Sequence, residues 1–308
     1  SLSAYDKDFS DAIYGKEIDG RYVTEQRLRK MLEHEYGLIE QRLSRDKFPN
    51  KCYFAFANTI ATINFTKKFK GHGWMGLRFQ LDPDDEPNDV IFHIRMKEEE
   101  AYLQQETIGI MGVNLIYGCF HIRNNPEELL RSLYDNIAKY KIEIDMIHFE
   151  GPEFKNVDNR LMSLQLIKNG MTDAVIFGPE GNNILPAALL YKKNILALRG
   201  SFRPATKVNI DMIKKGFGYF VDERKVDREN LVVLFEITLN NLKAEGEIDE
   251  QDFLDRAEIL CSLGQTVLIS NYQQYYKLVE YFTRYTEERM GLIMGVTNLE
   301  DLFDEHYY

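Results

Sequence analysis

The first 50 residues alternate apolar and charged positions with the spacing of a helix. Thr24 stands at the start of this pattern, where its hydroxyl can accept a hydrogen bond from the first turn. Leu28, Leu32 and Ile39 fall on one face, whereas the charged residues between them leave the other face to solvent. The pattern predicts an N-terminal helical segment over 1–50 that leads into the main fold.

Between residues 51 and 141 the pattern changes to short runs in which aromatic and β-branched residues alternate with small or polar ones. Such alternation is typical of strands. Asn125 followed by Pro126 marks the start of a helix after the last run. These features predict an antiparallel α+β region over 51–141, with strands at 52–65, 74–80, 90–96 and 115–122.

From residue 142 onward, short apolar runs and amphipathic stretches follow one another in turn. This order is typical of βαβ units, in which helices cover a parallel sheet. We therefore expect an α/β fold in which 142–308 form a doubly wound, mostly parallel, Rossmann-like domain. Its strands are predicted at 142–149, 174–177, 194–198, 266–270 and 291–294. Its helices are predicted at 159–168, 186–192, from 208, and at 228–244, 249–262 and 273–285.

The composition is that of an ordinary globular protein with an acid excess. Of the 308 residues, 44% are hydrophobic and 28% are charged, and the formal net charge is −11. This charge argues against broad binding to nucleic acid or to anionic membranes. The three cysteines have neither metal-ligand nor disulfide spacing, and no apolar run is long enough to span a bilayer. A cytoplasmic location is therefore expected.

Several predicted strands end in turns that contain glycine. Gly151, Gly178 and Gly200 come soon after such strands, and Gly181 lies close behind Gly178. Parallel strands would bring these turns to one edge of the sheet, where ligands of doubly wound folds bind. The turns also have a local explanation, because sharp connections between strands and helices favour glycine and proline. The first interpretation predicts a ligand cleft lined by these glycines.

The most informative motif is the stretch 198–213, which reads Leu-Arg-Gly-Ser-Phe-Arg-Pro-Ala-Thr-Lys-Val-Asn-Ile-Asp-Met-Ile. A glycine turn between a strand and a helix presents backbone N–H groups beside a helix N-terminus, which favours phosphate. The motif resembles the first signature of adenylyltransferases that act on nicotinate mononucleotide or phosphopantetheine, roughly Gly-Ser-Phe-Asp-Pro-x-Thr/His-x-Gly-His. The matching residues are Gly200, Ser201, Phe202, Pro204, Thr206, Asp211 and Ile213.

The resemblance implies a nucleotide site built on this turn. Gly200, Ser201 and Phe202 would shape the backbone beside a triphosphate, and Thr206 would face the reacting phosphate. ATP with Mg²⁺ is the cofactor that such a site would bind. The chain as a whole resembles a bacterial family sometimes labelled nicotinate-nucleotide adenylyltransferase.

The turn departs from the signature at the positions that carry the family's chemistry. Arg203 stands where the family has Asp, Val208 where it has Gly, and Asn209 where it has a His that contacts the phosphates. A guanidinium can bind a phosphate, and an Asn amide can donate a neutral hydrogen bond. If the site is catalytic, we expect Arg203, Thr206, Lys207 and Asn209 to act by positioning and charge stabilisation.

The tetrapeptide Phe-His-Ile-Arg occurs twice, from Phe92 to Arg95 and from Phe120 to Arg123. In a strand, His and Arg would share one face and Phe and Ile the other. Arg78 follows the same alternation, so neighbouring strands would gather both histidines and up to three arginines into an anion site, with 71–74 as a mobile loop. Ordinary alternation on a half-exposed sheet explains the same pattern. The histidines have no metal-ligand spacing, so no metal site is predicted.

Two hypotheses on function follow. The first is a cytoplasmic protein that binds phosphate or a nucleotide and is a degenerate relative of nucleotidyltransferases. The alternative is a non-catalytic metabolite sensor or protein-interaction scaffold on the same fold. The first predicts a small phosphorylated ligand as the partner, and both are compatible with a homo-oligomer. The aromatic residues at 303–308 predict that the end of the chain docks onto the fold or that the chain continues beyond Tyr308.

Overall fold

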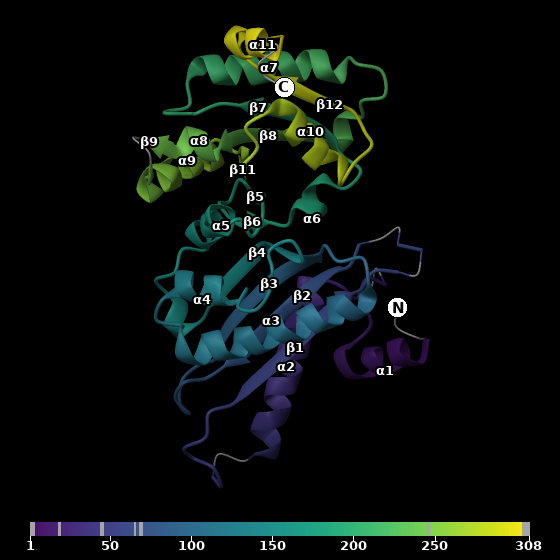
Figure 1. Cartoon of the computed structure of the whole chain (residues 1–308), viewed down its shortest axis with the longest axis vertical. Helices are drawn as coiled ribbons and strands as arrows, with labels where there is room; N and C mark the ends of the chain where they lie inside the picture. The colour runs from purple at the N-terminus through teal and green to yellow at the C-terminus, as the bar shows by residue number, and fades with distance from the viewer. Residues whose placement is uncertain are drawn as a thin grey trace. The chain divides into compact units, whose positions relative to one another are not determined.

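The computed structural model describes residues 4–17, 20–43, 46–64, 66–67, 70–244 and 247–303. The chain forms two compact units, unit 1 (Ser1–Thr172) and unit 2 (Asp173–Tyr308), and each is built around its own main sheet (Figure 1). The division falls after the expected boundary at residue 142, because the segment from 142 pairs with a strand of the first sheet. Residues 304–308, part of the segment expected to dock, lie outside the described residues.

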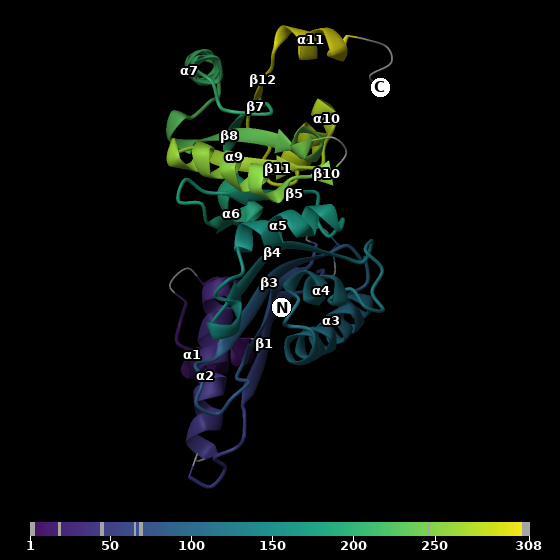
Figure 2. The ribbon, with the colours of Figure 1, turned by 90° about the vertical axis from the view of Figure 1, so that its left-hand side faces the viewer.

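Unit 1 contains a four-stranded antiparallel sheet. Its strands, in spatial order, are β1 (Phe54–Ala61), β2 (His72–Phe79), β3 (Asn88–Met96) and β4 (Ile142–Glu150). Its helices are α1 (Ala4–Tyr14), α2 (Glu25–Arg42), α3 (Ala101–His121), α4 (Pro126–Ser132) and α5 (Asn159–Lys168), with a 3₁₀ turn at Pro152–Phe154. Figure 2 shows α1 and α2 on one face of this sheet and α3 and α4 on the other.

Glycines let the helices of unit 1 approach the sheet closely. A Cβ atom on Gly76 of β2 would lie about 3 Å from side-chain atoms of Leu28 and Leu32 of α2. On the other face, a Cβ atom on Gly112 of α3 would lie 2.9 Å from the ring of Phe56. Both faces are therefore covered, and the expected half-exposed sheet is replaced by a sheet between two helical layers.

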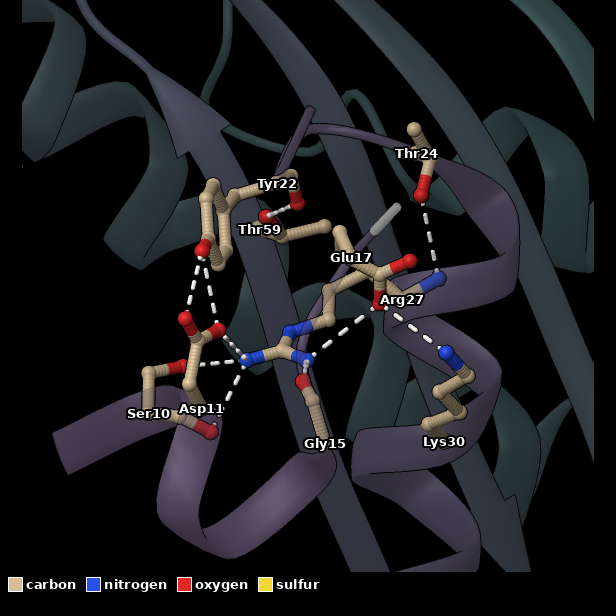
Figure 3. Close-up of polar contacts among 9 residues, drawn as sticks. All are labelled: Ser10, Asp11, Gly15, Glu17, Tyr22, Thr24, Arg27, Lys30 and Thr59. Atoms are coloured by element: carbon tan, nitrogen blue, oxygen red, sulfur yellow. Dashed lines mark hydrogen bonds and ion pairs between the residues drawn. The ribbon is translucent and has the colours of Figure 1, made fainter. Parts of the chain in front are cut away.

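A buried arginine of α2 forms hydrogen bonds to residues in and directly after α1 (Figure 3). The side chain of Arg27 is 1% exposed and donates hydrogen bonds to the backbone oxygens of Ser10 and Gly15 and to the hydroxyl of Ser10. It also pairs with the carboxylate of Glu17 at 3.2 Å, and Lys30 approaches the same carboxylate from the outside at 3.1 Å. The helix caps its own start, since Thr24 accepts a hydrogen bond from the N–H of Arg27.

Two tyrosine rings surround the same guanidinium. The central carbon of Arg27 lies 5.2 Å from the ring centroids of both Tyr14 and Tyr22, which is cation–π geometry. The hydroxyl of Tyr22 donates to the carboxylate of Asp11 at 2.8 Å, and its backbone oxygen accepts a hydrogen bond from Thr59 of β1 (Figure 3). The cluster thereby joins α1, α2 and the edge strand of the sheet.

Unit 2 contains a six-stranded mixed sheet. Its strands, in spatial order, are β12 (Met290–Ile293), β7 (Asn194–Arg199), β8 (Leu231–Thr238), β11 (Thr266–Ser270), β5 (Ala174–Phe177) and β6 (Asn183–Ile184). Its helices are α6 (Pro186–Leu190), α7 (Lys207–Val221), α8 (Leu239–Leu242), α9 (Glu250–Ser262), α10 (Tyr275–Thr283) and α11 (Val296–Leu302), with a 3₁₀ turn at Arg228–Asn230. A small ribbon pairs β9 (Lys243–Ala244) with β10 (Glu247–Ile248).

The four strands β12, β7, β8 and β11 are parallel, and β5 is antiparallel to β11. The expectation of an α/β unit with mostly parallel strands is thus confirmed, except at β5. Leu278 and Phe282 of α10 pack on one face of the sheet together with Leu190 of α6. On the other face, Phe253 of α9 contacts Phe177 at a ring distance of 5.9 Å.

Two elements differ from the sequence-based expectation. The stretch 115–122, predicted as a strand, belongs to the long helix α3, whose residues are apolar nearly all round. The stretch 228–244, predicted as a helix, contains the central strand β8, because its run of β-branched and aromatic residues is buried between two helical layers. None of the described helices is both long and apolar enough to cross a membrane.

The predicted anion site on paired Phe-His-Ile-Arg strands does not form. Phe120 and His121 belong to the last turn of α3, and only the first copy of the tetrapeptide lies in a strand, β3. His93 in that copy is 2% exposed instead of facing solvent.

Candidate functional site

Unit 2 has a pocket at the carboxyl ends of β7, β8 and β11. It encloses about 370 Å³. Most residues that line the pocket belong to the turns and the first helical residues that directly follow these three strands. One further lining residue, Asn298, belongs to α11. The lining residues are Arg199, Gly200, Ser201, Thr238, Asn240, Asn241, Gln273, Tyr275 and Asn298. Hydroxyl and amide groups dominate this wall, and Arg199 supplies its charge.

A buried ion pair fixes Arg199 at the end of β7. Its Nε and Nη2 atoms donate to the two carboxylate oxygens of Glu236 at 2.8 and 2.9 Å. Glu236 is fully buried on β8, and the hydroxyl of Ser270 on β11 donates to the same carboxylate at 2.6 Å. The pairing is bidentate, so it sets the plane of the guanidinium as well as its position. The three strands thus hold one cation in a fixed orientation.

The outer part of the guanidinium faces the start of α10. Nη1 of Arg199 donates to the backbone oxygen of Gln273 at 2.7 Å, and the guanidinium carbon lies 4.3 Å from the ring centroid of Tyr275. The hydroxyl of Tyr275 accepts a hydrogen bond from Asn298 at 3.1 Å. No side-chain hydrogen bond caps the N-terminus of α10. Its partial positive charge is therefore directed toward the region of Gln273 and Tyr275.

A second buried arginine holds the turn after β7. Arg256 of α9 is 3% exposed and donates to the backbone oxygens of Ser201 at 3.0 Å and Asn241 at 2.7 Å. It also pairs with Asp252, which in turn binds Arg203 at 3.2 Å. The predicted phosphate-binding residue Arg203 is thus joined to a carboxylate on the surface of α9, and its side chain is 50% exposed.

The predicted catalytic residues Thr206 and Asn209 form the N-terminal cap of α7. The Thr206 hydroxyl accepts a hydrogen bond from the N–H of Asn209, and the side-chain oxygen of Asn209 accepts one from the N–H of Thr206 at 2.8 Å. This reciprocal pair of hydrogen bonds is a capping box. It explains the presence of both residues by their role in starting the helix. Lys207 is the first residue of the helix and is exposed.

A variant tests this account of Thr206. Thr206→Ala is expected to lower the free energy of unfolding of unit 2 by about 1 kcal/mol, because one N–H of the first turn loses its acceptor. Urea denaturation measures this loss, and any stabilisation by a ligand should persist in the variant. An unchanged stability combined with a lost ligand effect would show that Thr206 acts on a ligand and not on the helix.

The remaining predicted residues of the motif divide between the pocket and the core. Gly200 and Ser201 line the pocket, as expected for a turn that meets a ligand. Phe202 is 3% exposed and packs against Phe235 at a ring distance of 5.2 Å. A Cβ atom on Gly200 would lie 3.0 Å from the Phe202 ring, so this glycine is needed for the turn itself.

The other glycine turns lie elsewhere. Gly178 and Gly181 follow β5, which runs antiparallel to β11, and so they lie at the opposite edge of the sheet from Gly200. Gly151 follows β4 of unit 1, and a Cβ atom there would lie 2.7 Å from the backbone of Asn88. The expected meeting of these turns at one edge is therefore wrong, since it assumed parallel strands in a single sheet.

Sequence reasoning missed most of the pocket. The prediction of a helix over 228–244 hid Glu236, Asn240 and Asn241, which the structure places at the end of β8 and directly after it. The signal that could have found Glu236 is its place inside a continuous apolar run, Leu-Val-Val-Leu-Phe-Glu-Ile, where an acid needs a buried partner. Gln273 and Tyr275 lie in the stretch 273–285, which was predicted only as a helix; in the structure Gln273 precedes α10 and Tyr275 is its first residue.

Comparisons with known proteins add no relative. No family model, no curated protein and no solved structure matches the chain significantly. Within the described part of the chain, no group of three or more His, Cys, Asp or Glu side chains is arranged to hold a metal ion.

Proposed function

We propose that unit 2 binds a small phosphorylated ligand, specifically a nucleotide, in the pocket at the carboxyl ends of β7, β8 and β11. We further infer that its sheet is of the doubly wound, Rossmann-like kind, since β12 lies beside β7 while β8 lies on the other side of β7. Where the chain switches sides in this way, ligands bind beyond the carboxyl ends of the strands. The cytoplasm, expected from the cysteines, is the proposed location.

The fixed guanidinium of Arg199 carries the proposal. The carboxylate of Glu236 balances the charge of Arg199, but Glu236 is fully buried. Of the two residues, Arg199 lines the cavity. A cation that is already oriented loses little entropy on meeting an anion. The uncapped start of α10 adds partial positive charge on the same wall. Both features favour a phosphate over a neutral or cationic group.

The neutral part of the lining suits the rest of a nucleotide. Asn240, Asn241 and Asn298 offer amide donors and acceptors, and the ring of Tyr275 offers an aromatic surface. Sugar hydroxyls and base edges are recognised by such groups. With ATP, the Mg²⁺ ion would arrive with the nucleotide, in agreement with the cofactor implied by the motif.

A non-catalytic sensor is the second candidate, and one observation favours it. Thr206 and Asn209, the residues best placed by the motif for chemistry, are engaged with each other in the helix cap. A binding protein needs only the pocket, whereas an adenylyltransferase also needs groups that stabilise charge on the reacting phosphate. Pyrophosphate release from ATP in the presence of nicotinate mononucleotide distinguishes the two candidates.

The binding proposal is tested by thermal unfolding with ATP–Mg²⁺, nicotinate mononucleotide or inorganic phosphate. A ligand present at about 100 times its Kd stabilises the native state by about 2.7 kcal/mol, so the unfolding temperature of unit 2 should rise. Ser201→Asp places a carboxylate at the pocket and should weaken binding at least about tenfold, because like charges in contact cost more than the 1.4 kcal/mol this requires.

Ser201→Asn is the matched control, since Asn has the size of Asp without the charge. It should keep the stabilisation by the ligand. If no phosphorylated ligand raises the unfolding temperature of the wild-type protein, or if Ser201→Asp and Ser201→Asn behave alike, the pocket does not bind an anion.

A further inference from the structure

Unit 1 contains a chain of three polar side chains that runs from its interior to its surface. Asp145 of β4 and His93 of β3 are both buried, and their side chains are joined by a hydrogen bond of 2.6 Å between Oδ1 and Nδ1. Nε2 of His93 lies 3.3 Å from Nδ1 of His72, an exposed residue at the start of β2. The chain therefore links a buried carboxylate to an imidazole in contact with solvent.

The pairing of the strands explains how the three side chains meet. Residue 93 pairs with Met146 and residue 94 with Ile144, so Asp145 is the extra residue of a β-bulge. A bulge can redirect a side chain that regular alternation would place elsewhere, and bulges are frequent beside active sites. Trp74, which pairs with His93 across the sheet, packs against the imidazole at a ring distance of 5.0 Å.

The hydrogen bonds set the protonation of both rings. A carboxylate only accepts hydrogen bonds, so Nδ1 of His93 carries a proton and its Nε2 is an acceptor. Nδ1 of His72 must then be the donor to His93, so the lone pair on Nε2 of His72 takes no part in these two hydrogen bonds. The second oxygen of Asp145 is buried and has no hydrogen-bond partner among the described residues. Its charge is therefore directed largely at His93.

β1 and β2 approach each other closely beside His72. A Cβ atom on Gly73 would lie 2.4 Å from the backbone oxygen of Thr59, so a larger residue at this position would displace one of the two strands. Gly73 thus permits the strand spacing at which the His72 ring reaches His93.

Positive charge lies next to this imidazole. In the strand register, Arg95 of β3 stands opposite His72 of β2, and Glu143 of β4 stands opposite Arg95. The ammonium group of Lys97 lies 3.5 Å from the carboxylate of Glu143. Partial burial, and then the neighbouring His93 and Arg95, lower the pKa of His72, while Asp145 opposes this effect. The ring is therefore neutral near pH 7.

We propose that His72 and Arg95 form a second site, which binds a small oxyanion that still carries a proton, such as a phosphate monoanion. Arg95 attracts the negative charge, and the lone pair on Nε2 of His72 accepts a hydrogen bond from the hydroxyl of the anion. The proton stays on the anion, and the hydrogen bonds through His93 to Asp145 keep the Nδ1 proton of His72 in place. His93 and Asp145 act as positioning residues, since they reach the anion only through His72.

The tautomer of His72 tests the first half of this proposal. Nitrogen-15 NMR of labelled imidazoles, at a mildly alkaline pH where the rings are neutral, should find the proton of His72 on Nδ1. Asp145→Asn removes the negative charge that fixes the direction of the hydrogen bonds through His93. His72 should then become a mixture of both tautomers. Asp89→Asn is the matched control, because Asp89 is a buried acid of the same strand as His93 that pairs with Arg78 instead.

The ligand is tested with inorganic phosphate in the same experiment. Its addition should shift the His72 ring resonances in the wild-type protein and in Asp89→Asn, and Arg95→Gln should weaken this effect at least about tenfold. The resonances of His72 report on this site alone, so they are independent of binding to the pocket of unit 2. A proton on Nε2 of His72 in the wild-type protein, or a ring that phosphate leaves unchanged, overturns the proposal.

Discussion

Replacing Glu236 by alanine is expected to lower the free energy of unfolding of unit 2 by about 3–5 kcal/mol, the usual cost of removing one partner of a buried ion pair. The carboxylate is fully buried and accepts hydrogen bonds from Arg199 and Ser270. Alanine would leave the guanidinium without its counter-charge and the hydroxyl without its acceptor. Urea denaturation followed by circular dichroism measures the change.

A double variant separates the charge effect from the loss of volume. Glu236→Leu combined with Arg199→Met replaces the pair by apolar side chains of similar size and should recover most of the lost stability. Trp74, the single tryptophan of the chain, lies in β2 of unit 1, so its fluorescence follows the other unit as an internal reference. A loss below about 1 kcal/mol for Glu236→Ala would mean that water already reaches the pair.

Local signals in the sequence predicted two helix starts correctly. Thr24 and Asn125 each accept a hydrogen bond from the first turn of a helix, as expected. Such caps depend on residues three positions apart, so a single sequence contains all the information. The motif at 198–213 has two interpretations for the same local reason, because a capping box and a phosphate signature both place a hydroxyl residue just before a helix.

Most elements that were predicted wrongly depend on contacts between residues far apart in the sequence. β8 was misassigned because it is buried on both faces, which removes the alternation of a half-exposed strand. α3 was misassigned because its exposed face also carries apolar residues, such as Val113 and Tyr117, which hides the period of a helix. The direction of β5 depends on its pairing with β11, a partner some ninety residues away, and no local pattern encodes it. Gly200 and Ser201 were found because the turn after β7 is local, whereas Glu236 and Tyr275 join the pocket only through the sheet.

Replacing Arg27 by leucine is expected to release α1 from α2 and to lower the free energy of unfolding of unit 1 by about 3–5 kcal/mol. Glu17, whose side chain is 10% exposed, would lose its buried partner and keep its outer contact with Lys30. The backbone oxygens of Ser10 and Gly15 would lose their donors as well. The Trp74 fluorescence transition in urea measures the change in stability.

Lys30→Ala provides the contrast, because it removes the other ion pair of Glu17. That bridge involves a lysine side chain that is 36% exposed, so its loss should cost about 1 kcal/mol or less. Amide hydrogen exchange locates the effect: Arg27→Leu should remove protection from Ala4–Tyr14, and Lys30→Ala should preserve it. If α1 stays protected in Arg27→Leu, apolar packing alone holds the helix, and the buried arginine has another purpose than fastening it.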